Sequence, residues 1–195
     1  MTPDIRKAQP GDASELAVLM NIAGDGIPAC LWEQMAGPGA DVMAFAAGRV
    51  ARSEGNFSYT NAHVALRGNS IAGMLLGYRL PDPPGASPPD DVPPVVRPLL
   101  ELEAMVPGSW YVNAVATVAA FRGQGVGRSL MELAERLAVA SNARAVSLIV
   151  GDGNEGALRL YARLGYQPAG RRPIVALPRF PHAGEWILMR KDVGP

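Results

Sequence analysis

The sequence predicts an α/β fold, a mixed α/β sandwich in which helices pack on a central sheet. Candidate strands occur before, between and after candidate helices, which is the order expected when both kinds of element share one core. Residues 145–150 (AVSLIV) are almost entirely apolar, as in a strand that is buried inside a sheet. Residues 56–66 and 70–80 have strand patterns separated by a turn at 67–69, so they predict a β-hairpin.

The N-terminal part of the chain is expected to contain a strand and three helices. Asp12 followed by Glu15 has the spacing of a capping box, which marks the start of a helix, and Gly24 marks the end of that helix. The expected elements are a strand at 5–9 and helices at 13–24, 27–35 and 41–54.

The C-terminal part alternates between strands and helices. Leu130, Leu133 and Leu137 recur at three- and four-residue spacing, so one face of their helix is expected to be buried. Gly165 is expected to cap the end of the following helix. The expected elements are a helical turn or two at 99–105, a strand at 110–118, a helix to about residue 142, the strand at 145–150, a helix at 154–165 and strands at 166–169 and 185–190.

Residues 81–98 form a proline-rich loop in this interpretation. Eight of these eighteen residues are proline, so neither a helix nor a central strand can pass through them. Because strands flank the loop on both sides, we interpret it as an insertion within a single domain that spans 1–195. A substrate lid and a partner-binding segment are the functional alternatives for this loop.

The composition argues against several classes of protein. Hydrophobic residues make up 48% of the 195 residues and charged residues 18%, which is ordinary for a globular protein with a full core. Lys plus Arg equals Asp plus Glu at 18 each, so there is no charge signature of nucleic-acid or anionic-membrane binding. Cys30 is the only cysteine, so neither an internal disulfide nor a metal cluster is expected. The first residues lack the apolar core of a signal peptide, and no apolar run approaches the ~18 residues that span a bilayer, so we expect a cytoplasmic protein.

Three glycines in the stretch FRGQGVG (121–127) indicate a backbone that must approach something closely. The spacing fails both common phosphate-binding motifs. A dinucleotide fingerprint would need glycine where the chain has Arg128 or Leu130, and a P-loop would need glycine in place of Arg128. A helix nevertheless follows at once, and the N–H groups at a helix N-terminus bind anions. From these residues alone, an anion site and a tight strand-to-helix turn both stay open.

Two motifs together resemble the GNAT superfamily of N-acetyltransferases. Arg122, Gly125 and Gly127 match the R/Q-x-x-G-x-G/A motif that follows a strand in this family. A second motif, N-x-x-A-x-x-L-Y-x-x-x-G-F/Y, follows after one intervening strand. It is matched position for position by Asn154, Ala157, Leu160, Tyr161, Gly165 and Tyr166. The order of elements in the rest of the chain also fits this resemblance.

The resemblance implies a fold, a co-substrate and a set of contacts. The fold would be a GNAT-like central sheet, mixed but mostly antiparallel, with helices on both faces and a splay between the fourth and fifth strands. Acetyl-CoA would be the co-substrate, with its pyrophosphate held by the backbone of Arg122, Gly123, Gln124, Gly125, Val126 and Gly127. The pantetheine arm would pair with the strand around Val115, Ala116 and Thr117, and Asn154 would contact it from the next helix.

The resemblance also implies direct attack of an amine on the thioester, without a covalent enzyme intermediate. Tyr161, with a reference pKa of ~10, would donate a proton to the departing thiolate, and the N–H of Val115 would stabilise the oxyanion. The acceptor would be an amine of a small molecule or a peptide, which no motif identifies. The alternative is a GNAT-like module that binds an acyl-CoA as a sensor or scaffold with little turnover. The oligomeric state stays open, with a homodimer as one option.

The sequence departs from the family pattern at the general base. A glutamate commonly stands nine residues before the motif arginine, where this chain has Asn113, and an amide cannot act as a base. Either Glu101 or Glu103 acts through water, or the acceptor amine has a low pKa. At pH 7 an alkylamine costs about 4.6 kcal/mol to deprotonate, whereas an α-amino group costs about 1 kcal/mol. The sequence alone favours the weakly basic acceptor.

Four other side chains invite a functional interpretation. Asp25 and Trp32 follow the first helix, where relatives form part of the acceptor pocket, and His182 lies in a segment that often closes this pocket in relatives. His63 falls within a candidate strand. A structural or surface role is the favoured interpretation for all four.

Overall fold

A computed structural model of the chain describes residues 2–84, 92–176 and 183–194. The chain forms two compact units. Met1–Tyr78 with Ala114–Leu133 forms the N-terminal unit, and Arg79–Asn113 with Ala134–Pro195 forms the C-terminal unit. The expectation of a single domain over 1–195 stays a prediction.

Three antiparallel strands build the sheet of the N-terminal unit. β1 (Asp4–Lys7) pairs with β2 (Ala62–Arg67), and β2 pairs with β3 (Ser70–Arg79). Gly68 makes the turn between β2 and β3 with a φ of 58°, a left-handed conformation that favours glycine. The predicted hairpin is therefore confirmed.

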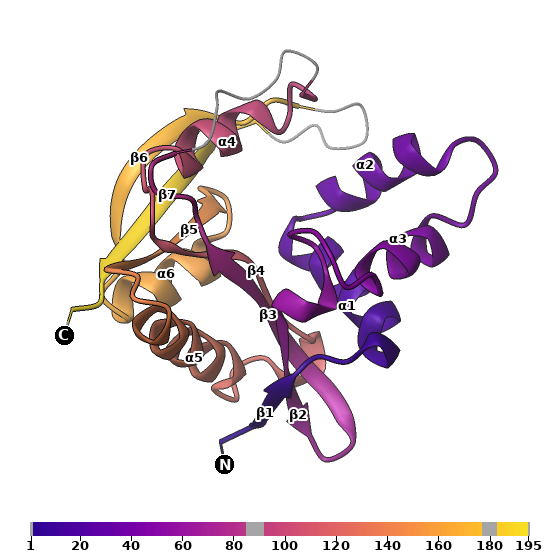
Figure 1. Ribbon diagram of the computed structural model, residues 1–195, viewed down its shortest axis with the longest axis horizontal. Helices are drawn as coiled ribbons and strands as arrows, with labels where there is room; N and C mark the ends of the chain where they lie inside the picture. Colours follow the sequence, from indigo (N-terminus) through magenta and orange to yellow (C-terminus); the bar gives the residue numbers. More distant parts are fainter. Residues whose placement is uncertain (1, 85–91, 177–182, 195) are drawn as a thin grey trace. The chain divides into compact units, whose positions relative to one another are not determined.

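Three helices cover one face of this sheet, as Figure 1 shows: α1 (Ala13–Ala23), α2 (Ile27–Ala36) and α3 (Val42–Val50). Their apolar residues recur at helical spacing, so each helix buries one side of its surface, and α2 packs against α1 and α3. The cluster that joins α1 and α3 to β2 and β3 includes Leu16, Leu19, Met20, Ala46, Val50, Val64, Met74 and Leu76.

α5 (Val126–Ala140) packs on the opposite face of these strands. A Cβ placed on Gly73 of β3 would lie 3.0 Å from Val126 Cγ1 and 3.3 Å from Leu130 Cδ1. It would also lie 2.6 Å from the carbonyl oxygen of Ala116, which belongs to β4 (Trp110–Thr117). Glycine at position 73 therefore allows both β4 and the start of α5 to approach β3 closely.

The C-terminal unit contains the remaining strands. β5 (Ala145–Gly151) pairs antiparallel with β7 (Glu185–Asp192), which pairs antiparallel with β6 (Gln167–Pro173). β4 and β5 pair in parallel from Trp110↔Val146 to Val112↔Leu148.

The seven strands follow the order β1-β2-β3-β4-β5-β7-β6, in which β4 and β5 are parallel and the pairs β1–β2, β2–β3, β5–β7 and β7–β6 are antiparallel. The parallel pairing ends at Val112, while β4 runs on to Thr117, as the predicted splay requires. The structure thus confirms the predicted fold class: a mixed, mostly antiparallel sheet with helices on both faces.

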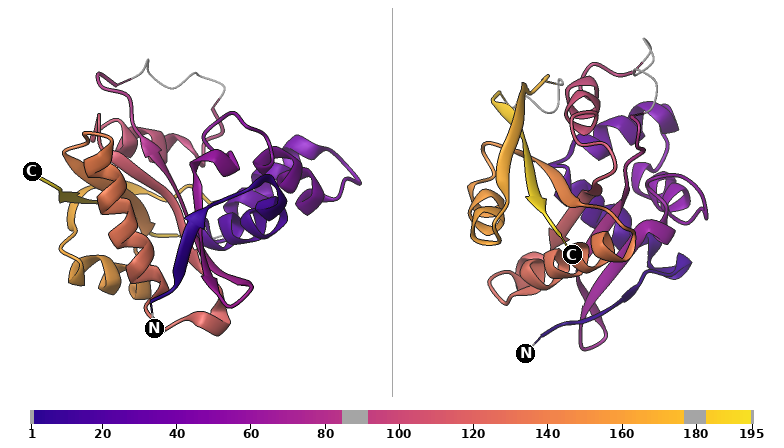
Figure 2. Two further views of the ribbon diagram at one scale, coloured as in Figure 1. Left: turned by 60° about the horizontal axis from the view of Figure 1, so that its bottom comes forward. Right: turned by 60° about the vertical axis from the view of Figure 1, so that its left-hand side comes forward.

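Two helices belong wholly to the C-terminal unit. α4 (Arg97–Glu103) packs beside β6 and β7 (Figure 1). A Cβ on Gly170 of β6 would lie 2.9 Å from Met105 Cε and 3.2 Å from Leu102 Cδ2, so this contact is tight. α6 (Glu155–Arg163) follows β5 along the chain, and Figure 2 shows it beside the strands of this unit. No helix among the described residues is both long and apolar enough to cross a membrane.

The predicted capping box at the start of α1 is wrong. Asp12 stands at the N-cap position, but its side chain makes no capping bond to α1. Instead, its carboxylate accepts hydrogen bonds from the Arg6 guanidinium at 2.7 and 2.9 Å and from the Gln9 N–H at 2.7 Å. The charge-assisted pair with Arg6 is the stronger interaction, so Asp12 stabilises the preceding 3-10 turn rather than the helix.

Two predicted boundaries also change. The strand expected from residue 56 begins only at Ala62, because a 3-10 helix at Tyr59–Asn61 precedes it. The proline-rich loop predicted over 81–98 ends before Arg97, where α4 begins with proline in its first turn. Proline is tolerated there because the N–H groups of the first turn have no helical partner. Residues 85–91 of the loop lie outside the described part of the chain.

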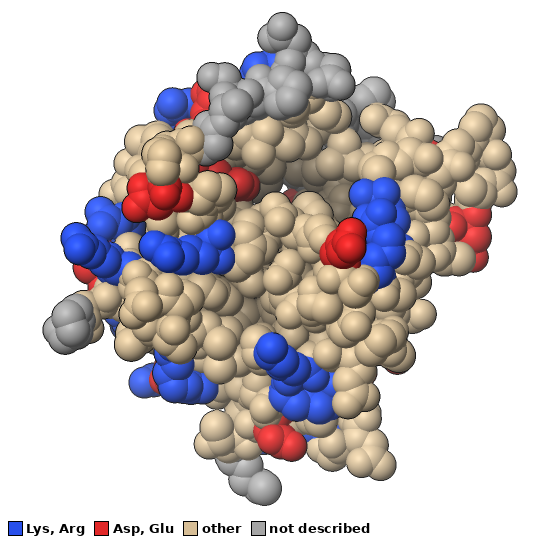
Figure 3. Space-filling view, in the orientation of Figure 1, with Lys and Arg blue, Asp and Glu red and all other residues tan. Residues whose placement is uncertain are grey.

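Charged side chains of both signs are interspersed in small groups on the face drawn in Figure 3. Several exposed charges of the described residues form short ion pairs. Examples are Arg128–Glu132 and Arg159–Glu155, each at 2.8 Å, and Arg190–Asp192 at 2.6 Å. Exposed pairs of this kind contribute little to stability, about 0–1 kcal/mol each.

Candidate functional site

The glycine loop, residues 121–127, connects β4 to α5 in the N-terminal unit. Gly123 and Gly125 have φ angles of 73° and 81°. A Cβ on either glycine would meet no atom within 4 Å. The left-handed backbone, rather than crowding, is therefore what favours glycine at these two positions. The open space beside them gives a ligand close access to the main chain.

The backbone N–H groups of residues 123–128 donate to no described residue. The first hydrogen bond of α5 runs from the Ser129 N–H to the Gly125 carbonyl, at 3.0 Å. The Arg122 N–H, by contrast, donates to the Ala119 carbonyl at 3.2 Å, so the row of available donors begins at residue 123. Consecutive unpaired donors at a helix N-terminus form a backbone site for a phosphate.

Three arginines surround the loop. Arg67 of β2 donates to the Gln124 carbonyl at 3.2 Å and so ties the loop to the hairpin. Arg122 Nε donates to the Thr117 carbonyl at 3.4 Å. Arg128 pairs with a glutamate one turn along α5, at 2.8 Å. The guanidinium groups of Arg67 and Arg122 add positive charge close to the loop, which favours an anion further, whereas the charge of Arg128 is offset by its glutamate partner.

The end of β4 presents two different backbone edges. The Val118 N–H donates to the Ala72 carbonyl of β3 at 2.9 Å. Because the hydrogen-bonding groups alternate along a strand, Ala116 also turns its backbone toward β3, whereas Val115 and Thr117 turn theirs to the other side. Val115 and Thr117 are therefore placed to pair with an extended ligand. Ala116 is placed differently, because its backbone groups face β3 and its side chain lies in the core.

Asn154 stands at the N-cap of α6 in the C-terminal unit. Its Oδ1 accepts a hydrogen bond from the Ala157 N–H at 3.1 Å, as the sequence predicts. The residue is exposed. Because capping uses the oxygen, the amide nitrogen is available to donate to a ligand.

Tyr161 lies in α6 with only 6% of its surface exposed. Burial raises the pKa of its hydroxyl well above the ordinary value of 10.0, so the group is protonated at neutral pH. Its ring centroid lies 6.0 Å from that of Tyr166, with 59° between the planes. The Lys191 Nζ lies 5.8 Å from the Tyr166 ring and pairs with Glu135 at 2.7 Å. These contacts hold the side chain of Tyr166, which packs against Tyr161, in place.

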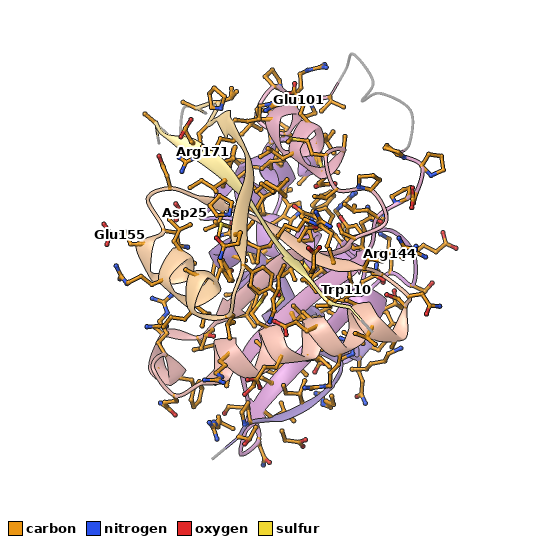
Figure 4. All side chains as sticks on the ribbon, turned by 90° about the vertical axis from the view of Figure 1, so that its left-hand side faces the viewer. Asp25, Glu101, Trp110, Arg144, Glu155 and Arg171 are labelled. Atoms are coloured by element: carbon orange, nitrogen blue, oxygen red, sulfur yellow. The ribbon has the colours of Figure 1, made fainter. Side chains whose placement is uncertain are left out.

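Two carboxylates on α4 differ in their environments. Glu101, labelled in Figure 4 at the same end of the unit as Arg171, has 44% of its side chain exposed and pairs with Arg172 at 2.6 Å. Glu103 is half-buried and accepts a hydrogen bond from the Tyr111 hydroxyl. Burial raises the pKa of Glu103 from 4.5 to about 7, and the hydrogen bond from Tyr111 opposes this rise.

The four other candidate residues have varied surroundings. Asp25 is exposed in the turn between α1 and α2, with a φ of 51°. Trp32 is buried in the core at 6% exposure. His63 is half-buried in β2, where burial and, to a smaller extent, Lys7 lower its pKa. His182 lies outside the described residues.

Two contacts of the candidate site could not be found by inspecting the sequence. Arg67 lies 57 positions from Gln124, so no local pattern connects them. The bond between Tyr111 and Glu103 joins a strand to a separate helix. The one available signal was indirect: with an amide at Asn113, any general base would have to come from another element.

Comparison with known proteins identifies a matching family. The model of the acetyltransferase (GNAT) family matches residues 37–166, a stretch that contains the glycine loop and the Asn154 and Tyr161 motif. No curated protein is significantly similar to the chain.

Several solved structures share the fold along nearly the whole chain. One acetyltransferase is 20% identical with a TM-score of 0.67, over 98% of this chain and 100% of that one. An N-acetyltransferase from Staphylococcus aureus Mu50 is 21% identical with a TM-score of 0.60, over 96% and 100%. The apo form of an agmatine N-acetyltransferase mutant is 16% identical with a TM-score of 0.65, over 98% and 100%. At these identities the likeness shows the fold alone.

Proposed function

Because the chain belongs to the GNAT acetyltransferase family, we propose that it transfers the acetyl group of acetyl-CoA to the amine of a small molecule or a peptide. The row of N–H groups at 123–128, unpaired among the described residues, carries this proposal. It offers the pyrophosphate of acetyl-CoA a set of donors at the start of the 15-residue helix α5, where the helix dipole also favours an anion.

Other residues are proposed to bind the remaining parts of the cofactor. The pantetheine arm pairs with the backbone groups of Val115 and Thr117, which turn away from β3. Asn154 donates its amide nitrogen to this arm while its oxygen caps α6. Arg122 contributes its side-chain charge, since its own N–H is already bonded to a carbonyl.

The reaction is a direct attack of the amine on the acetyl carbonyl. The N–H of Val115 stabilises the oxyanion, a kind of contact worth about 3–4 kcal/mol of barrier. Tyr161 donates to the departing sulfur. Since burial raises its pKa above that of a thiol, ~8.5, full transfer from tyrosine alone is uphill. Tyr161 therefore gives its proton to sulfur only as it takes up a proton from the attacking nitrogen, so that its hydroxyl is neutral again at the end of the step.

An assay of amine-dependent thiol release tests this function. The protein is incubated with acetyl-CoA and, in separate reactions, with butylamine, alaninamide or agmatine, and free CoA thiol is followed with time. Agmatine is included because a protein of the same fold is an agmatine N-acetyltransferase. We expect thiol release that requires an amine, with the acetylated amine identified by mass spectrometry.

Reactions without amine measure simple hydrolysis and serve as the control. Tight binding of CoA in calorimetry, without amine-dependent thiol release for any acceptor, would instead support the acyl-CoA-binding module. Absence of CoA binding would remove the assignment of the glycine loop.

A further inference from the structure

On the basis of the proposed acetyl transfer, we propose that Glu103 is the general base that takes the proton from the acceptor amine. This role belongs to a residue of α4, a helix that follows the proline-rich loop, rather than to the strand position occupied by Asn113. All residues that support it lie in the C-terminal unit.

The position of Glu103 follows from its contact with β4. The Tyr111 hydroxyl donates a hydrogen bond to the Glu103 carboxylate. Side chains two residues apart lie on the same face of a strand, so Tyr111 and Asn113 share one face of β4. The carboxylate of Glu103 is therefore held on the face of β4 from which a glutamate at position 113 would project.

The helix that carries Glu103 is firmly held. Leu102 is completely buried, and Leu102 and Met105 pack so closely on Gly170 of β6 that a Cβ there would lie within 3.2 Å of both side chains. The exposed pair between Glu101 and Arg172 also joins α4 to β6. A general base must keep its position relative to the reacting nitrogen, and this packing provides that rigidity.

Glu101 is a poorer candidate for the same role. Its carboxylate is exposed and bound to the guanidinium of Arg172 at 2.6 Å. A bound cation stabilises the charged carboxylate and weakens it as a base. Glu103 instead has a neutral partner in the Tyr111 hydroxyl.

The electrostatic surroundings suit a base at neutral pH. Burial raises the pKa of Glu103 to about 7, and an efficient general base has a pKa near the working pH. The charged groups on the elements packed against α4, and on α4 itself, are Arg97, Glu101, Arg171, Arg172, Glu185, Arg190, Lys191 and Asp192. Those on β6 and β7 form ion pairs: Arg171–Glu185, Arg172–Glu101, Arg190–Asp192 and Lys191–Glu135.

The proton and electron transfers balance with Glu103 in this role. The acceptor binds as an ammonium ion, and Glu103 takes one proton from it, directly or through a water molecule. The neutral nitrogen attacks the acetyl carbon, a C–N bond forms, and the C–S bond breaks with its electron pair on sulfur. Tyr161 gives its proton to sulfur and regains the second proton of the nitrogen. Glu103 then releases its proton to solvent, so the products are the amide, CoA and one proton.

A base at Glu103 changes the class of acceptor that the chain can use. At pH 7 only about one alkylamine molecule in 2,500 is neutral, given a pKa of ~10.4. An enzyme without a base would be confined to weakly basic amines. With Glu103, we expect an alkylamine, bound as its cation, to be an efficient acceptor.

The pH dependence of kcat in Glu103→Gln tests this inference, with butylamine and alaninamide as acceptors. For the wild type, kcat with butylamine should rise with pH through a midpoint near 7, the value to which burial brings Glu103. Glu103→Gln should lower kcat with butylamine about 10²–10³-fold at pH 8 and abolish that midpoint. The loss with alaninamide should be at most about tenfold, because an α-amino group with a pKa of ~7.7–8.0 is largely neutral at that pH.

Glu101→Gln is the matched control on the same helix, and its midpoint and kcat should stay close to those of the wild type. Tyr111→Phe provides a second variant if Glu103→Gln does not fold. Because the Tyr111 hydrogen bond lowers the pKa of Glu103, its loss should move the midpoint to higher pH. A midpoint that persists in Glu103→Gln, or stays fixed in Tyr111→Phe, overturns the role of Glu103. Wild-type turnover in the same assay shows that the proposed function stands even then, whereas a wild type inactive with all amines overturns both.

Discussion

In the proposed function, the glycine loop of the N-terminal unit and the side chains of Glu103 and Tyr161 in the C-terminal unit act on a substrate in different ways. The loop offers main-chain N–H groups at 123–128, which are unpaired among the described residues. Glu103 and Tyr161 offer side-chain oxygens whose pKa values are raised by burial. One region depends on backbone conformation and open access, and the other depends on packing that removes water.

This difference predicts how each region responds to mutation. A change of side chain in the loop matters when it alters the φ angles of Gly123 or Gly125, which are 73° and 81°. For Glu103 and Tyr161, removal of a single oxygen or charge should be enough, because the proposed mechanism uses one atom of each side chain. Binding and chemistry should therefore be separable by mutation.

The largest effect is expected for Tyr161→Phe. Without the hydroxyl, no group donates to the departing sulfur, so kcat should fall about 10²–10⁴-fold, the scale of proton-transfer roles. Calorimetry should show a Kd for CoA within about threefold of the wild type, since α6 and its packing are unchanged. Tyr166→Phe, whose ring centroid lies 6.0 Å away, is the matched control and should keep near-normal kcat. Equal losses in both variants would indicate a packing role for the pair.

Gly125→Val should affect binding instead. Valine at a φ of 81° is strained by about 1–3 kcal/mol, and relief of this strain turns the N–H groups away from a common ligand. We expect CoA to bind about 10–100-fold more weakly, measured by calorimetry. Gly55→Val is the control, because Gly55 is also exposed, with a φ of 89° and no atom near its Cβ position. Gly55→Val should lose a similar amount of stability but keep its affinity for CoA. If Gly55→Val also binds CoA more weakly, the effect of Gly125→Val reflects strain in general and not the loop.

Thermal stability should report the burial of Glu103 independently of catalysis. Its pKa is about 7 in the folded chain and near 4.5 when exposed, so folding is favoured by the protonated form. The contribution of Glu103 to the free energy of unfolding is fully present below pH 4.5 and is lost as the pH rises through 7. The Tm of Glu103→Gln relative to wild type should therefore increase between pH 5 and pH 8, by on the order of 5 °C. A difference that stays constant with pH would show that Glu103 is not buried.

The smallest effect is expected for Asn154→Ala. Loss of the 3.1 Å capping bond should cost about 1 kcal/mol, or about 2–4 °C in Tm. Asn154→Asp keeps the capping oxygen but removes the amide nitrogen, so its Tm should match the wild type while CoA binds more weakly. If both variants bind CoA normally, Asn154 serves only as a cap.

Much of the fold could be predicted from the sequence where local patterns are strong. The apolar run at 145–150 became β5 with one added residue, and the Asn154 cap lies where its motif places it. Local rules failed where a distant partner competed. Asp12 has the spacing of a capping box, but Arg6 occupies its carboxylate with two hydrogen bonds.

The candidate site shows the same limit. Glycines mark the loop because a left-handed backbone needs them, so this feature is visible in the sequence. The environment of Glu103 is not visible, since its pKa depends on burial beneath segments distant in the chain and on Tyr111. For this reason the sequence alone could not distinguish Glu101 from Glu103 and favoured a weakly basic acceptor, whereas the structure gives the two glutamates different surroundings.

The central claim, that the loop binds and the buried side chains perform the chemistry, is tested most directly by single-turnover rates at saturating acetyl-CoA. We expect Gly125→Val to reach a rate within about threefold of the wild type once the cofactor saturates it, because its defect lies in binding alone. Tyr161→Phe should stay at least about 100-fold slower at every acetyl-CoA concentration. If the two variants lose rate to the same extent at saturation, binding and chemistry are not divided between these regions.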